Sequence, residues 1–198
     1  MLARRSVVAV AALWLGAVLV SPARAGQPTD QLVGSIDRVM KVLNDAELKK
    51  PAKAQQRQAA IRRAAEDMFD FEEFARRSLA RHWEARTPAE QAEFVKLFRD
   101  LLGRVLTGKL NLYNGEKVVV VGDAIDGIHG DEATVKTLVG AKQGAIPVDF
   151  WMVHRGGHWR TCDVVIGGVS LVRSYRAQFD KVIKRTSYQQ LVKQVREK

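Results

Sequence analysis

The stretch that decides the fold is AIPVDFWMVHRGGHWRTCDVVIGG, residues 145–168. Apolar and polar residues alternate along much of it, and β-branched and aromatic side chains are frequent. The Gly156-Gly157 pair in its middle is typical of a two-residue turn between antiparallel strands. We therefore expect a β-hairpin with strands over residues 145–154 and 158–166.

Two further segments rich in β-branched residues precede this hairpin, over residues 116–124 and 132–141. Turn signals lie between all the segments, at residues 126–131 and at Gln143-Gly144. Connections this short favour consecutive antiparallel pairing, because parallel strands need a long crossover. The central part of the chain thus predicts a four-stranded antiparallel meander.

Helical periodicity dominates the chain on both sides of these strands. One helix start is marked by Asp70 as the cap, by Glu73 completing a capping box, and by Phe69 and Phe74 as a hydrophobic staple. Thr87 with Pro88 and Glu90 marks another start. We expect helices over about 28–43, 52–67, from 70, 88 to about 113, 170–184 and from 186 or 187 onward. This order predicts an α+β fold, with several helices covering one face of a curved antiparallel sheet.

The first 25 residues have the three parts of a secretory signal peptide. Arg4 and Arg5 form the positive region, Val7–Val20 is an apolar run too short to span a bilayer, and Ala23-Arg24-Ala25 is a peptidase site. The alternative is an uncleaved N-terminal anchor. We expect residues 1–25 to be the signal and residues 26–198 to form a single domain, exported to the periplasm.

The chain is basic, with a formal net charge of +10. Removing the signal with its three arginines leaves +7. In a cytosolic protein this excess would favour nucleic acid, but for an exported chain we expect anionic headgroups or acidic protein surfaces instead. A simple solubilising excess of charge is the alternative.

Neither a metal site nor a catalytic motif is expected. The turn at Gly156-Gly157 pairs Arg155 with His158 and His154 with Trp159, so the two histidines point to opposite faces of the sheet and cannot share a zinc ion. Cys162 is the sole cysteine, so no internal disulfide is possible, and we expect it to be a buried, unreactive thiol. The sequence also lacks a nucleophile elbow, a zinc-protease motif and a phosphate loop.

Large apolar side chains are abundant for a domain of this size. They are spread along the chain between Phe69 and Phe179. They can fill an ordinary core, or they can line a cavity between the curved sheet and its helices. Composition alone leaves both interpretations open.

Several segments resemble one family. They are Phe69-Asp70-Phe71, Arg81-His82-Trp83, Thr87-Pro88-Ala89-Glu90-Gln91, Val148-Asp149-Phe150 with the hairpin through Trp159, and DVVIGGVSLVRSYRAQF at residues 163–179. Together they resemble the MlaC family, also described as toluene-tolerance or ABC-transporter auxiliary substrate-binding proteins. The resemblance extends over about residues 30 to 195, nearly all of the predicted mature chain.

The resemblance implies a periplasmic phospholipid carrier rather than an enzyme. Members of the family shuttle lipid between an outer-membrane lipoprotein complex and an inner-membrane ABC transporter with an MCE-domain subunit, which maintains outer-membrane lipid asymmetry. It implies a monomer with bound phospholipid as cargo, no other cofactor, no metal and no nucleic acid. A carrier of hopanoids or another lipid, a secreted enzyme and a protein-binding chaperone are the alternatives.

We expect the cavity wall to combine one face of the strands with the apolar stripes of the helices. The expected residues are Phe74, Phe94, Phe98, Leu101, Val119, Val121, Phe150, Met152, Val164, Val169, Val172 and Tyr175. Plain core packing is the alternative for each of them. We place Arg173 and Arg176 near the mouth of the cavity, with an ordinary solvated surface as the alternative.

Overall fold

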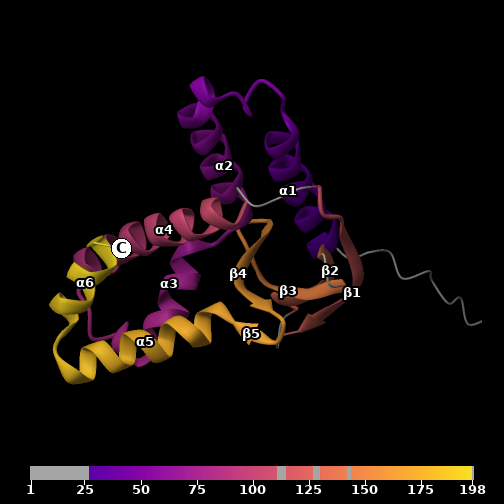
Figure 1. The fold of residues 1–198 in the computed structure, drawn as a ribbon. Helices are drawn as coiled ribbons and strands as arrows, with labels where there is room; N and C mark the ends of the chain where they lie inside the picture. The colour runs from indigo at the N-terminus through magenta and orange to yellow at the C-terminus, as the bar shows by residue number, and fades with distance from the viewer. Residues whose placement is uncertain (1–26, 111–114, 127–129, 142–143, 198) are drawn as a thin grey trace, which may run out of the picture.

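The computed structural model describes residues 27–110, 115–126, 130–141 and 144–197, and the predicted signal peptide lies outside them. The described helices are α1 (Gln27–Asn44), α2 (Ala54–Met68), α3 (Phe71–Leu79), α4 (Pro88–Leu110), α5 (Leu171–Arg185) and α6 (Tyr188–Glu197), with short 3-10 turns at Pro51–Lys53 and Ala80–His82. In Figure 1, α1 and α2 lie side by side as a hairpin, while α3 to α6 gather into a second group. No helix of the described residues is long and apolar enough to cross a membrane.

The strands form one antiparallel sheet in the order β1-β2-β3-β4-β5 (Figure 1). They are β1 (Val118–Asp126), β2 (Glu132–Ala141), β3 (Gly144–Arg155), β4 (His158–Ile166) and β5 (Val169–Ser170). The predicted α+β fold with an antiparallel meander is confirmed, apart from the fifth strand. That strand has two residues, too few to produce a period-two pattern, and it pairs with β4 across the turn at Gly167-Gly168.

The hairpin of β3 and β4 has the predicted register. His154 lies opposite Trp159 and Arg155 lies opposite His158. Both turn glycines have positive φ angles, +57° at Gly156 and +80° at Gly157, which side chains disfavour. Since opposite residues share a face and neighbours alternate, the two histidines point to opposite faces of the sheet.

A β-bulge at Cys162 interrupts the pairing of β3 with β4. Trp151 pairs with Asp163 and Met152 pairs with Thr161, so Cys162 has no partner residue. Its thiol is buried and donates to the Trp151 carbonyl oxygen at 3.3 Å. Burial raises the pKa of this thiol to about 12, which agrees with the predicted unreactive cysteine.

The predicted start of α3 is confirmed in part. Asp70 accepts a hydrogen bond from the Glu73 amide at 2.9 Å, and the Phe69 and Phe74 rings lie 6.4 Å apart as a staple. The capping-box prediction is wrong in its second half, because the Asp70 amide donates to the Thr161 carbonyl at 2.9 Å instead. The bond to β4 satisfies this amide and leaves the Glu73 carboxylate available for other partners.

The start of α4 has a complete capping box. The Thr87 hydroxyl accepts from the Glu90 amide at 3.3 Å, and the Glu90 carboxylate accepts from the Thr87 amide at 2.9 Å. Both ends of the reciprocal pair predicted from the sequence are therefore present.

Aromatic packing joins the second group of helices. The Phe98 ring on α4 lies 5.9 Å from Phe74 on α3, and 5.0 and 5.4 Å from Tyr175 and Phe179 on α5. Phe94 stacks one turn earlier, 5.7 Å from Phe98. These contacts fix the first half of α4 among its neighbours, and Phe98 is fully buried.

Asp163 connects β4 to the beginning of α5. Its buried carboxylate accepts from the Ser170 hydroxyl at 2.5 Å and from the Val172 amide at 3.0 Å. The Ser170 hydroxyl in turn accepts from the Arg173 amide at 3.0 Å and caps the helix. One side chain thus satisfies donors at the helix start that would otherwise be buried without partners.

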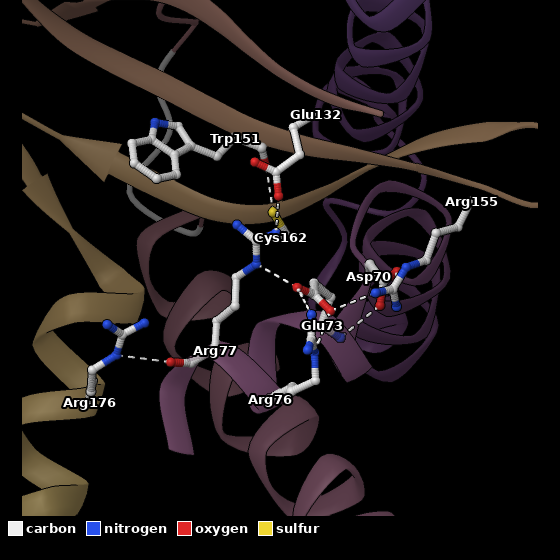
Figure 2. A network of polar contacts seen from close by, with 9 residues as sticks. All are labelled: Asp70, Glu73, Arg76, Arg77, Glu132, Trp151, Arg155, Cys162 and Arg176. Atoms are coloured by element: carbon white, nitrogen blue, oxygen red, sulfur yellow. Dashed lines mark hydrogen bonds and ion pairs between the residues drawn. The ribbon is translucent and has the colours of Figure 1, made fainter. Parts of the chain in front are cut away.

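A second polar network centres on Glu73, which is 1% exposed (Figure 2). Its carboxylate accepts from Arg76 and Arg77 on the same helix and from Arg155 at the end of β3, at 2.6 to 2.8 Å. Arg77 also donates to Glu132 of β2 at 2.5 Å. The network therefore ties α3 to two strands.

The arginines decide the charge state of Glu73. Burial alone would raise the pKa of this carboxyl, but hydrogen bonds and positive charge from Arg76 and Arg77 outweigh burial and lower the pKa from 4.5 to about 2. Folding is therefore favoured by ionised Glu73.

We predict that Asp163→Ala lowers the free energy of unfolding by about 3 kcal/mol, because it strands a buried hydroxyl and a buried amide. Urea denaturation followed by circular dichroism measures the change. Asp149→Ala, a half-buried carboxylate on the neighbouring strand β3, is the control and should change stability by less than about 0.5 kcal/mol. An equal loss of unfolding free energy in the two variants would show that the contacts of Asp163 stabilise the fold no more than those of Asp149.

We also predict an acid-sensitive contribution from Glu73. Its stabilisation is complete above pH 4.5, the pKa of the free side chain, and is lost as the pH falls toward 2. Glu73→Gln should lower stability by about 3 kcal/mol at neutral pH and flatten the pH dependence in this window. Denaturation at a series of pH values tests this, with the neighbouring exposed Glu72→Gln as control. A slope unchanged by Glu73→Gln would contradict the assignment.

Candidate functional site

A cavity of about 560 Å³ lies between the helices and the sheet. Helices α1 and α2 form one side, the second half of α4 forms another, and the strands β1 to β4 supply the floor. Ligand-binding cavities in proteins commonly have volumes of 300–1,000 Å³. The cavity is therefore of the size that holds a small-molecule ligand.

The interior of the cavity is apolar. Its aliphatic and aromatic lining residues are Ile36, Val39, Met40, Ile61, Ala65, Met68, Phe69, Phe71, Leu106, Val118, Val139, Ala141, Ile146, Val148, Phe150, Val164 and Ile166. A surface of this kind favours hydrocarbon over water, because apolar groups gain free energy when they leave water.

Polar side chains are confined to a few positions of the lining. They are Gln58, Arg62 and Glu66 on α2, Arg99, Asp100, Arg104 and Thr107 on α4, and Glu116 just before β1. All of them are exposed or half-buried, as are Ile146 and Ile166 of the sheet, whereas Phe150, Val164 and Met68 in the interior are buried. The polar residues therefore mark the opening of the cavity, and a bound molecule would have its polar part there.

The structure places two of the twelve expected residues, Phe150 and Val164, in the cavity wall. Seven others belong to the packed interior instead. Phe74, Phe94, Phe98, Leu101, Met152 and Val172 are buried in the main core, and Tyr175 packs against it. These seven residues therefore match the alternative interpretation, plain core packing. They lie in or against the packed core, which contains the aromatic cluster around Phe98. Contact of any of the twelve with lipid stays a prediction.

The remaining three expected residues lie on the surface. Val119, Val121 and Val169 are 54%, 56% and 59% exposed. In β1 the expected alternation was one residue out of phase, since Val118 lines the cavity and Val120 packs against the core. A run of four valines gives no polar residue to set the phase, so the sequence left it undetermined.

Sequence reasoning missed the aliphatic residues of α1 and α2. Val39 and Met40 on α1 and Ile61 and Met68 on α2 line the cavity. The signal was present as an apolar stripe on each helix, but large aromatic side chains were given more weight. The aromatic cluster around Phe98 belongs to the packed core, whereas the cavity lining combines aliphatic side chains with Phe69, Phe71 and Phe150.

The arginines expected at the mouth lie elsewhere. Arg173 and Arg176 are exposed on α5, where Arg176 donates to the Arg77 carbonyl at 3.0 Å (Figure 2), and neither lines the cavity. Arg173 and Arg176 therefore match the alternative interpretation, an ordinary solvated surface. Three other arginines, Arg62, Arg99 and Arg104, take the position at the opening.

Two glycines in α4 face open space. A Cβ added at Gly103 or Gly108 would meet no atom within 4 Å, so neither glycine allows a close backbone approach. Gly103 lines the cavity, whereas Gly108 does not. Gly103 therefore leaves room inside the cavity that any side chain would occupy.

Among the described lining residues there is no histidine or cysteine, and the described residues contain no group of three side chains placed to hold a metal ion. The Glu73 carboxylate is held by arginines and does not line the cavity. The site is an apolar volume of about 560 Å³ with charged groups at its opening.

Solved structures share this architecture. The chain aligns with the phospholipid-binding protein from Ralstonia solanacearum, solved in complex with a phospholipid, at a TM-score of 0.74 and 22% sequence identity. The alignment covers 87% of this chain and 96% of that one. At this identity, the likeness supports the α+β fold itself.

Sequence comparisons extend the likeness. The toluene tolerance protein Ttg2D of Pseudomonas putida is 27% identical over 100 residues, which is 50% of this chain. The match spans 46% of that relative, about half of its length. The family described as MlaC protein matches residues 34–197, which include every described strand and nearly all of the described helices. This chain belongs to the MlaC family.

Proposed function

We propose that the protein is a periplasmic phospholipid carrier, which holds the acyl chains of one lipid molecule in the cavity between α1, α2, α4 and the sheet. The observation that carries the proposal is the apolar interior of this 560 Å³ cavity, with its polar groups confined to the opening. An amphiphile with hydrocarbon tails and a charged head has the same distribution of polarity.

The physical requirement on such a carrier is strict. A lipid with about thirty tail methylenes would cost about 24 kcal/mol to expose to water, at about 0.8 kcal/mol for each methylene. In a bilayer the same methylenes are already out of water. A cavity must therefore be nearly as apolar as a membrane if loading and unloading are both to proceed. The apolar side chains that line the cavity, Val39 and Ile166 among them, meet this requirement.

The relatives support the same cargo. The structural neighbour from Ralstonia solanacearum is described as phospholipid-binding and contains a phospholipid. Membership of the MlaC family supports a role in lipid transport. We propose that the chain exchanges lipid with an outer-membrane lipoprotein complex and with an inner-membrane ABC transporter, and so helps to maintain outer-membrane lipid asymmetry. The signal-like residues 1–25 and the net positive charge suit a protein that visits membrane complexes from the periplasm.

We predict that Gly103→Trp greatly reduces the lipid that co-purifies with the protein, because the indole ring occupies the cavity. Gly108→Trp is the matched control, since it places the same side chain on the same helix outside the cavity. Both changes replace a helical glycine, so neither should impair helix formation. Mass spectrometry of extracted lipid gives the result.

The comparison is informative only for folded variants, which circular dichroism establishes. Equal lipid content in Gly103→Trp, Gly108→Trp and the unmodified protein would argue against this cavity as the lipid site. Absence of phospholipid from gently purified protein would argue against the proposed function as a whole.

A second pair of variants tests the same site from the sheet. We expect Val118→Trp to lower bound phospholipid and its neighbour Val119→Trp to leave it unchanged, because only Val118 lines the cavity and Val119 is exposed. The same extraction measures both. The reverse order would mean that lipid binds to the outer face of the sheet.

A further inference from the structure

Three arginines at the opening of the cavity are not held in ion pairs within the described residues. Arg62 on α2 and Arg99 and Arg104 on α4 line the opening, and none of them forms an ion pair within the described part of the chain. By contrast, Arg77 and Arg155 each have a carboxylate oxygen within 2.7 Å. The guanidinium groups at the opening are therefore available to donate hydrogen bonds to a ligand.

Three carboxylates, Glu66, Asp100 and Glu116, also line the cavity, so the formal charges of the lining balance, but none of the three arginines is held in an ion pair with a described residue. Glu66 follows Arg62 by four residues and Asp100 precedes Arg104 by four, a spacing at which helical side chains can meet. Neither pair approaches within ion-pair distance in the structure, although Arg86 and Glu90 do so at the same spacing. Glu116 is the third carboxylate of the opening.

The geometry of a lipid brings its phosphate to these arginines. If the tails fill the apolar interior, the glycerol backbone must lie near the opening, and the phosphate follows it. Burying the phosphate deeper would be unfavourable because a charge would leave water without a partner. The planar guanidinium group binds a phosphate through two parallel hydrogen bonds, which makes arginine the residue suited to this position.

We propose that Arg62, Arg99 and Arg104 bind the phosphate of the lipid headgroup, so that the carrier selects phosphate-bearing lipids over neutral lipids with the same tails. The inference rests on the proposed function, and it adds the chemical feature by which cargo is recognised. The arginines come from two different helices, so one phosphate would also join α2 to α4 at the opening.

The first test is the selectivity of the unmodified protein. Delipidated protein is titrated with fluorescent phosphatidylglycerol and with fluorescent diacylglycerol of identical acyl chains. We expect phosphatidylglycerol to bind at least about tenfold more tightly, as charge-assisted hydrogen bonds contribute substantially. Its affinity should fall with added salt, whereas that of diacylglycerol should not.

The second test uses two triple variants with the same change in charge. Replacing Arg62, Arg99 and Arg104 by Gln should remove both the preference and its salt dependence, while diacylglycerol still binds. The control replaces Arg63, Arg160 and Arg185, which are exposed and do not line the cavity. Arg63 is the immediate neighbour of Arg62, and the control should keep the selectivity of the unmodified protein.

The outcomes separate this inference from the proposed function. If both lipids bind equally to the unmodified protein, or if both triple variants lose the preference equally, the arginines do not form the phosphate site, while lipid carriage stands. If neither lipid binds, both proposals fail. Inorganic phosphate at the lipid concentration should not displace phosphatidylglycerol, and displacement would indicate a general anion site instead of a headgroup site.

Discussion

The structure depends on the packing of the first half of α4 against α3 and α5. Phe94 and Phe98 are fully buried among aromatic rings from both helices, which fixes the position of α4. The second half of the same helix continues past this cluster and meets α1, α2 and the sheet at the cavity, where Gly103 has no side chain. One helix thus belongs to the solid core at one end and to the cavity wall at the other.

Polar contacts keep this arrangement without filling the cavity. Asp163 joins β4 to α5, and Glu73 with its arginines joins α3 to β2 and β3 (Figure 2). Both carboxylates are buried outside the cavity lining, where their partners satisfy them. These contacts anchor α3 and α5 to the sheet at positions outside the cavity.

Local signals in the sequence predicted most of the fold. The caps at Asp70 and Thr87 and the turn at Gly156-Gly157 are short-range features, and each specifies its own geometry. The cavity was harder to predict, because a large apolar residue has the same pattern in a core as in a cavity wall. Phe98 and Phe150 illustrate this: both were expected to line the cavity, and only long-range packing places the first in the core.

The most direct measurement of where the tails lie is photo-crosslinking with a phospholipid that carries a diazirine at the end of one acyl chain. Irradiation of the loaded protein followed by peptide mass spectrometry identifies the labelled residues. If the tails lie in the cavity, the labels will be on interior residues such as Met68, Phe150 and Val164. Labels concentrated on the exposed residues Val119, Val121 and Trp151 of the sheet would contradict this position of the tails.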